Sequence, residues 1–128
     1  MRTYKILVVE DDPVYIKILS HILNEIDNNI LVLQTNNGIE ALEILKNEIP
    51  DLILTDWDMP QMSGIEFCKK VQSIQEYKDI PVIMCTGINT SSENLKTAFE
   101  LIVLKNATNV SGHQKRPKIV YRKLHHNF

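Results

Sequence analysis

Short apolar runs alternate with longer amphipathic segments over most of this chain, and that alternation restricts the possible folds more than any other feature. The short runs cover residues 4–9, 30–35, 51–56 and 81–86, and most of their positions are apolar. Such runs are typical of strands buried on both faces of a parallel sheet. Parallel strands need crossover connections, which are usually helices. The pattern therefore predicts an α/β domain with helices on both faces of the sheet.

The segments between the runs carry signals for the start and the end of helices. Pro13 stands where a first helical turn would begin, and Asp12 precedes it as a candidate N-cap. Pro50 ends a second helix, and a third helix follows the loop that closes at Gly64. Residues 90–93 have the form of a capping box, which predicts a fourth helix running to about residue 102.

Length and composition indicate one globular domain without a membrane segment. The chain has 128 residues, of which 44% are hydrophobic and 23% are charged. This is enough for one core and too little for two. No apolar run approaches the roughly 20 residues that a membrane span requires. Cys68 and Cys85 lie far apart and match no metal-binding spacing, as expected of reduced thiols in the cytoplasm.

The charge is distributed unevenly along the chain. Residues 1–100 contain 8 Lys and Arg and all 16 Asp and Glu, whereas residues 101–128 contain 6 Lys and Arg and no acid. A basic tail is one way to bind nucleic acid. No recognisable DNA-reading motif accompanies these cations, so we do not expect DNA binding.

Polar residues follow three of the predicted strands at the point where each strand ends. They are the acids at positions 10–12, Asp56 with Asp58, and Thr86. Taken singly, each has an ordinary explanation: Asp12 caps a helix, the acids at 56 and 58 favour a turn, and Thr86 bonds its own backbone. The carboxyl ends of parallel strands meet at one edge of the sheet, which is where open α/β sheets bind ligands.

Taken together, these acids predict a metal site. Neighbouring strands would bring Asp11, Asp12 and Asp56 within several ångströms of one another. Two carboxylates about 4 Å apart repel by roughly 4 kcal/mol at an effective dielectric of 20, so the cluster needs a cation or a proton. Oxygen ligands suit Mg²⁺ or Mn²⁺. A divalent ion beside one exposed carboxylate is the arrangement that phosphoryl transfer to an aspartate requires.

Four blocks of the sequence resemble the receiver domain of bacterial two-component response regulators, in particular the single-domain, chemotaxis-type regulators. The blocks are residues 6–13, 37–42, 50–64 and 80–87, and the resemblance covers residues 4–101. It implies a receiver domain over residues 1–128 with a flavodoxin-like, doubly wound parallel sheet of five strands in the order 2-1-3-4-5. The fifth strand would have to lie near residues 102–110, where no segment has a clear strand pattern, and residues 119–124 could form a short final helix.

The resemblance also implies roles for individual residues. Asp56 would be the acceptor that becomes an aspartyl phosphate. Asp12, Asp56 and the backbone carbonyl of Asp58 would hold Mg²⁺, and Asp11 would contribute through water. The Thr86 hydroxyl would bond a phosphoryl oxygen. The donor would be a phosphohistidine on a histidine kinase or a histidine phosphotransfer protein.

The sequence departs from the family pattern after residue 101. The family's lysine at the end of the fifth strand falls on Asn109, and its switch aromatic falls on Asn106. Lys105, four residues upstream of that lysine position, is the nearest cation that could stand in for it. Residues 102–128 are either a divergent tail with its own surface or a segment rewritten by a frameshift or a cloning artefact. Resequencing the gene separates these alternatives.

Three functions fit these observations to different degrees. The leading hypothesis is a cytoplasmic, non-enzymatic signalling module that takes a phosphoryl group on Asp56 and switches a surface for a downstream protein, with a homodimer as one form. The second is a degenerate receiver that binds proteins without phosphorylation, which the missing lysine favours. The third is an enzyme of the haloacid-dehalogenase type, because Asp56-Trp57-Asp58 matches its Asp-x-Asp pattern. The chain is too short for that enzyme's remaining parts.

Overall fold

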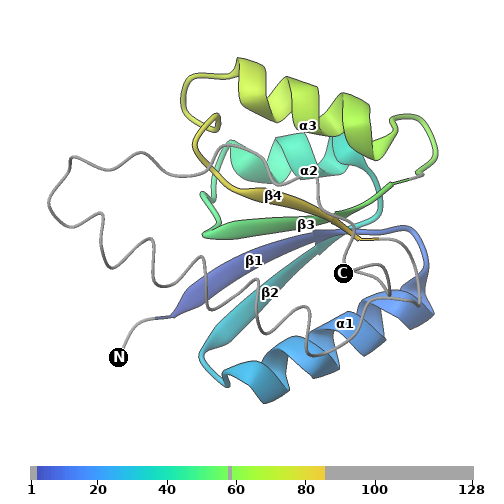
Figure 1. Cartoon of the computed structure of the whole chain (residues 1–128), viewed down its shortest axis with the longest axis vertical. Coiled ribbons are helices and arrows are strands. Elements are labelled where there is room, and N and C mark those ends of the chain that lie inside the picture. Colours follow the sequence, from blue (N-terminus) through green and yellow to red (C-terminus); the bar gives the residue numbers. More distant parts are fainter. Residues whose placement is uncertain (1–2, 58, 86–128) are drawn as a thin grey trace, which may run out of the picture.

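The apolar runs pair side by side as parallel strands at the centre of the molecule. A computed structural model describes residues 3–57 and 59–85, and Figure 1 shows the elements that they form. The four described strands lie in the order β2-β1-β3-β4. The elements are β1 (Tyr4–Val9), α1 (Pro13–Ile26), β2 (Ile30–Thr35), α2 (Gly38–Leu45), β3 (Leu52–Asp56), α3 (Gly64–Ser73) and β4 (Val82–Cys85).

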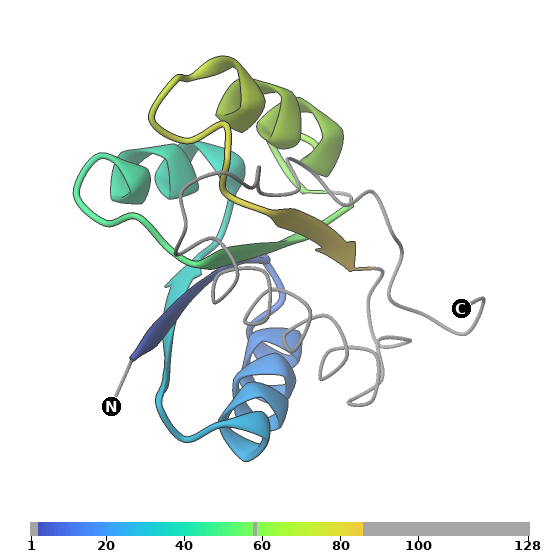
Figure 2. The ribbon, with the colours of Figure 1, turned by 60° about the vertical axis from the view of Figure 1, so that its left-hand side comes forward.

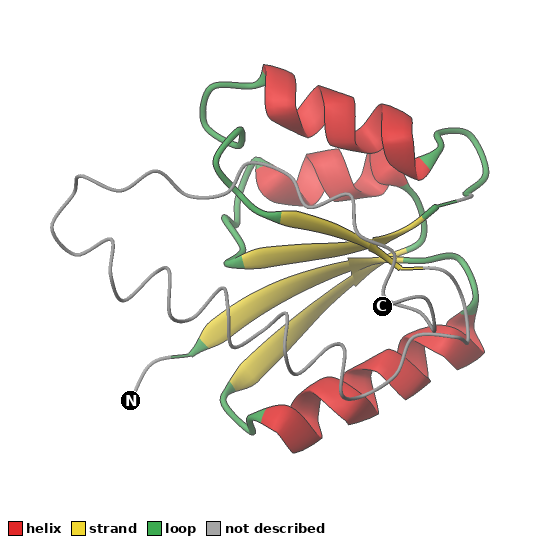
Figure 3. Cartoon of the chain, in the orientation of Figure 1, coloured by secondary structure: helices red, strands yellow, loops and turns green. Residues whose placement is uncertain are grey.

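The helices cover both faces of the sheet. Figures 1 and 2 place α1 on one side and α2 with α3 on the other, and Figure 3 shows the same three layers coloured by type of element. Alternate residues of β1 account for this division. Ile6 and Val8 pack with α1 in one core cluster, whereas Leu7 and Val9 pack with α2 and α3 in the other. Because successive strand side chains point to opposite faces, one continuous apolar run supplies both cores.

Side-chain caps fix where each helix begins. The Asp12 carboxylate accepts a hydrogen bond from the Val14 amide at 3.0 Å, and Pro13 occupies the first turn of α1. Asn37 caps α2 in the same way, because its side-chain oxygen accepts a hydrogen bond from the Glu40 amide. Ser63 and Glu66 form a reciprocal capping box at the start of α3. These bonds satisfy amide groups that the first helical turn would otherwise leave unpaired.

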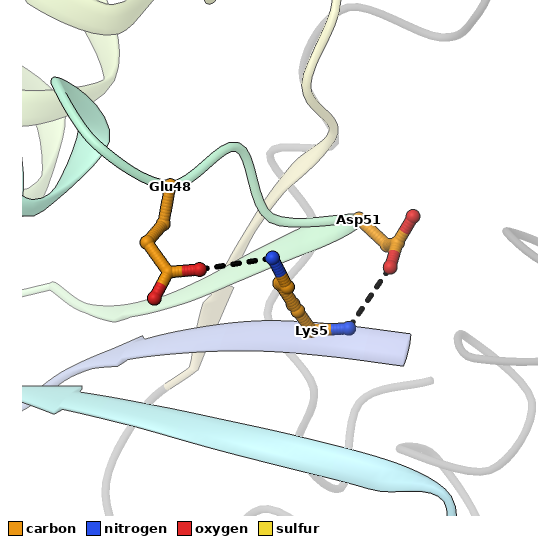
Figure 4. A network of polar contacts seen from close by, with 3 residues as sticks. All are labelled: Lys5, Glu48 and Asp51. Carbon is orange, nitrogen blue, oxygen red and sulfur yellow. Dashed lines mark hydrogen bonds and ion pairs between the residues drawn. The ribbon is translucent and has the colours of Figure 1, made fainter. Parts of the chain in front are cut away.

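The amino edge of the sheet is held by a small polar network, drawn in Figure 4. The backbone amide of Lys5 donates to the Asp51 carboxylate, and the Lys5 ammonium donates to Glu48, each at 2.9 Å. The network joins β1 to the loop between α2 and β3. It lies at the opposite end of the strands from the predicted site.

The predicted architecture is confirmed for the part of the chain that the structure describes. The strand order agrees with the first four positions of the order 2-1-3-4-5. The helix expected after residue 90, the fifth strand and the tail at 102–128 lie outside the described residues. No helix within the described ranges is both long enough and apolar enough to cross a membrane.

Candidate functional site

Three carboxylates meet at the carboxyl edge of the sheet. β1 and β3 are neighbours, and Val9 pairs with Thr55, so the residues that follow these two lie side by side. Glu10 and Asp11 follow β1, and Asp56 is the last residue of β3. One ligand oxygen of each of these three residues lies within 4.8 Å of the others. The sheet topology itself therefore assembles an acidic cluster at this edge.

Glu10 is the most deeply buried member of the cluster. It is only 4% exposed, and its carboxylate accepts a hydrogen bond from the Asp12 amide at 3.0 Å. The pKa of Glu10 is raised from 4.5 to about 7, chiefly by burial; the hydrogen bond from the Asp12 amide lowers it, and the neighbouring Asp56 and Asp11 contribute to the rise. The cluster therefore favours a proton or a cation among its oxygens near neutral pH.

The Asp56 carboxylate is held in one orientation by its own backbone. Its Oδ1 accepts a hydrogen bond from the Trp57 amide at 2.7 Å. The carbonyl of Asp56 accepts a second hydrogen bond, from the Thr55 hydroxyl at 3.2 Å. Trp57 and Met59 are partly buried against the core cluster of α2 and α3. Asp56 itself is half-buried at the rim, where a ligand from solvent can reach it.

The loop between β3 and α3 is tied to the end of β3. The Gly64 amide donates to the Trp57 carbonyl at 2.9 Å, which closes the base of the loop. At its tip Gln61 has a φ of 71°, in the left-handed region, and the Met62 amide donates to the Pro60 carbonyl at 2.7 Å. The capping box at Ser63 then starts α3 directly.

The structure brings together two of the predicted metal ligands, Asp11 and Asp56. The third member of the cluster is Glu10, which sequence reasoning did not choose, while the Asp12 carboxylate caps α1. The interpretation of Asp12 as a helix cap is thus confirmed. The predicted cap at Asp12 is the signal that points to Glu10, because it draws attention to the other two of the three consecutive acids. Asp58, Thr86 and Lys105 lie outside the described residues.

A family model and a curated relative both match this chain, and they point to the same family. The family model described as "Response regulator receiver domain" matches residues 6–109. The "Chemotaxis protein CheY homolog" of Campylobacter jejuni is 40% identical over 83 residues. That match covers 64% of this chain and 63% of the relative, which is less than two thirds of its length.

Two solved structures show the same fold. The signal receiver domain of a signal transduction histidine kinase from Syntrophus aciditrophicus has a TM-score of 0.63 and 26% identity, and the match covers 93% of this chain and 98% of that one. The phosphorylated cyanobacterial phytochrome response regulator RcpA also has a TM-score of 0.63 and 26% identity. Its match covers 78% of this chain and 76% of that one.

Proposed function

The chain belongs to the response regulator receiver domain family, and from that premise we propose that it is a signalling module phosphorylated on Asp56 with the help of Mg²⁺. The observation that carries the proposal is the cluster of Glu10, Asp11 and Asp56 oxygens at the carboxyl edge of the sheet. One of these residues, Asp56, is half-buried at the rim beside two further acids. This is the set of groups that phosphoryl transfer to a carboxylate needs.

The donor atoms of the cluster fit Mg²⁺. All are carboxylate oxygens, which magnesium prefers. Burial raises the pKa of Glu10, and the negative charges of Asp56 and Asp11 add to that rise, so a divalent cation would relieve the cost of the buried charge. Glu10, Asp11 and Asp56 would hold the ion. Bound there, Mg²⁺ would neutralise oxygens of the incoming phosphoryl group. Asp12 is engaged as a helix cap, so we assign to Glu10 the role of metal ligand that the sequence analysis expected of Asp12.

The chain's own residues prepare Asp56 for attack. The Trp57 amide fixes Oδ1, so the carboxylate keeps one orientation as the donor approaches. An oxygen of Asp56 forms the new bond to phosphorus while the phosphorus–nitrogen bond of a donor phosphohistidine breaks. The imidazole leaves with the electron pair of that bond and takes up a proton. The product is an aspartyl phosphate on the signalling module.

The partners follow from this chemistry and from the relatives. The Syntrophus receiver domain belongs to a signal transduction histidine kinase, and RcpA was crystallised phosphorylated. We propose a histidine kinase or a phosphotransfer protein as the donor, and a downstream protein as the target, in the cytoplasm. The Thr86 hydroxyl would bond a phosphoryl oxygen, the Asp58 carbonyl would bind the ion, and Lys105 would stand in for the family's lysine. Residues 1–128 are proposed to form one receiver domain.

A second candidate function is a receiver that binds its partner without phosphorylation. Its support is Asn109, which stands where the family has a lysine. That lysine normally pairs with a phosphoryl oxygen, so its loss would weaken the response to phosphate. The two candidates differ in one observable: whether phosphorylation changes the oligomeric state or the affinity for a partner.

Labelling by a small phosphodonor tests the proposal. Acetyl phosphate with Mg²⁺ should add one phosphoryl group to the intact mass of the chain, and EDTA should prevent it. Asp56→Asn should abolish the label because it removes the nucleophilic oxygen. Asp79→Asn is the matched control, since Asp79 precedes β4 at the opposite edge of the sheet. Equal labelling of the Asp56→Asn variant and the parent would refute the assignment.

A further inference from the structure

Gly64 lies against the backbone of the proposed phosphoacceptor. A Cβ atom added at Gly64 would stand 2.2 Å from the Asp56 carbonyl oxygen and 3.2 Å from both the Asp56 carbonyl carbon and the Trp57 Cα. Cβ atoms do not approach other heavy atoms within 3.0 Å, so a side chain at this position would force the backbone apart by about 1 Å or rotate the peptide unit. Only a glycine leaves the peptide between Asp56 and Trp57 where it is.

That same peptide unit orients the Asp56 carboxylate. Its N–H, on Trp57, donates to Asp56 Oδ1 at 2.7 Å, and its carbonyl oxygen is the atom that a side chain at Gly64 would strike. The two groups belong to one rigid plane. A rotation that relieves the clash at the oxygen therefore moves the N–H away from the carboxylate. The position of Gly64 is coupled in this way to the orientation of the reacting group.

Thr55 holds the carbonyl of this peptide unit by a hydrogen bond. Its hydroxyl, on a side chain that is 1% exposed, lies 3.2 Å from the Asp56 carbonyl oxygen and 3.8 Å from the Met59 sulfur. The hydroxyl thus contacts both the end of β3 and the loop that follows. Gly64 closes the same loop through its 2.9 Å bond to the Trp57 carbonyl.

We propose that Gly64 and the Thr55 hydroxyl are positioning residues that clamp the peptide unit between Asp56 and Trp57 and so fix the Asp56 carboxylate for phosphoryl transfer. The inference rests on the proposed function and adds to it two residues that act through Asp56. Misplacement of a reacting group by about 1 Å can lower a rate by about 100-fold. The clamp therefore sets the rate at which a correctly folded chain is phosphorylated.

The test measures the maximal phosphorylation rate at saturating acetyl phosphate and Mg²⁺, with each rate divided by the folded fraction from a urea titration. Gly64→Ala should lower this rate by about 10- to 100-fold. Gly38→Ala is the matched control, because the added Cβ there meets the flexible Met62 sulfur at 2.8 Å rather than the backbone of the site. It should keep the parental rate.

A second pair of variants separates positioning from packing. Thr55→Val keeps the shape of the side chain and removes the hydroxyl, so it should lower the rate by about tenfold. Thr55→Ser keeps the hydroxyl and should restore the rate to within about twofold of the parent. This pair decides the question if Gly64→Ala does not fold.

The outcomes distinguish the clamp from the function on which it rests. If the parent is labelled and Gly64→Ala reacts at the parental rate, the clamp is refuted and the proposed function stands. Equal rates for Thr55→Val and Thr55→Ser refute it as well. If the parent itself takes no label, the proposed function fails, and the clamp fails with it.

Discussion

Replacing Glu10 by glutamine should stabilise the Mg²⁺-free protein at pH 8 and weaken its binding of Mg²⁺. Glutamine keeps the shape of the side chain and an oxygen that can accept the Asp12 amide, but it removes the buried charge. In the parent, the pKa of Glu10 is raised from 4.5 to about 7, chiefly by burial. Between these values the folded state binds more protons than the unfolded chain. The stability that comes from protonated Glu10 is therefore fully present below pH 4.5 and is lost as the pH rises through 7.

The size of the effect follows from the same pKa. The rise from 4.5 to about 7 corresponds, at about 1.4 kcal/mol for each pH unit, to about 3 kcal/mol. Asp11 is exposed at the rim, so water screens part of the repulsion between the carboxylates, and we expect about 1–3 kcal/mol. The glutamine variant does not titrate at this position. It should exceed the parent in stability by that amount at pH 8 and by much less at pH 5.

Urea unfolding of both proteins in EDTA, at pH 5 and at pH 8, measures this difference. Adding Mg²⁺ at pH 8 should then stabilise the parent more than the variant, because the variant has lost one ligand oxygen with its charge; a tenfold weaker affinity appears as about 1.4 kcal/mol. The reasoning is refuted if the variant is no more stable than the parent at pH 8. It is also refuted if the two proteins lose the same stability between the two pH values.

Three further predictions concern Asp12, Ser63 and Cys68. Asp12→Asn should bind Mg²⁺ with parental affinity in a Trp57 fluorescence titration, because asparagine caps a helix as well as aspartate does; a loss of tenfold or more would return Asp12 to the ligand set. Ser63→Ala should reduce the urea-unfolding free energy by about 1 kcal/mol through loss of the α3 cap, and an unchanged midpoint would contradict the cap. Burial raises the pKa of the Cys68 thiol to about 12, so a thiol reagent at pH 8 should modify the Cys68 peptide only after denaturation. Rapid modification of the native chain would show that α3 is not packed as described.

Most of the fold could be predicted because local signals and burial agree. The run ending at Val9 is apolar at successive positions, as a central strand covered on both faces must be. Pro13 and Ser63 stand at the starts of α1 and α3. The predicted third strand begins one residue early, at Asp51, whose carboxylate instead accepts the Lys5 amide. The hydrophobic pattern within one segment gives no information about a contact between residues that are 46 positions apart, as Lys5 and Asp51 are.

The acidic site could be predicted as a group but not residue by residue. Consecutive acids at 10, 11 and 12 follow the end of β1, where the alternation of a strand no longer dictates which side chain faces its neighbour. The helix N-terminus also uses one of these carboxylates, because Asp12 Oδ1 accepts the Val14 amide. The clamp around Asp56 was not predictable at all. It depends on Gly64 meeting the end of β3 across a loop, which only the folded geometry reveals.

An anomalous difference map from a crystal of the full chain soaked in Mn²⁺ would show directly whether a divalent cation binds among these carboxylates. Mn²⁺ takes the same oxygen ligands as Mg²⁺ and can be located without ambiguity. We expect a strong peak among the oxygens of Glu10, Asp11 and Asp56, at about 2.1–2.2 Å from those that the ion touches. A well-ordered site with no peak, or with the ion bound elsewhere and these carboxylates turned apart, would contradict it.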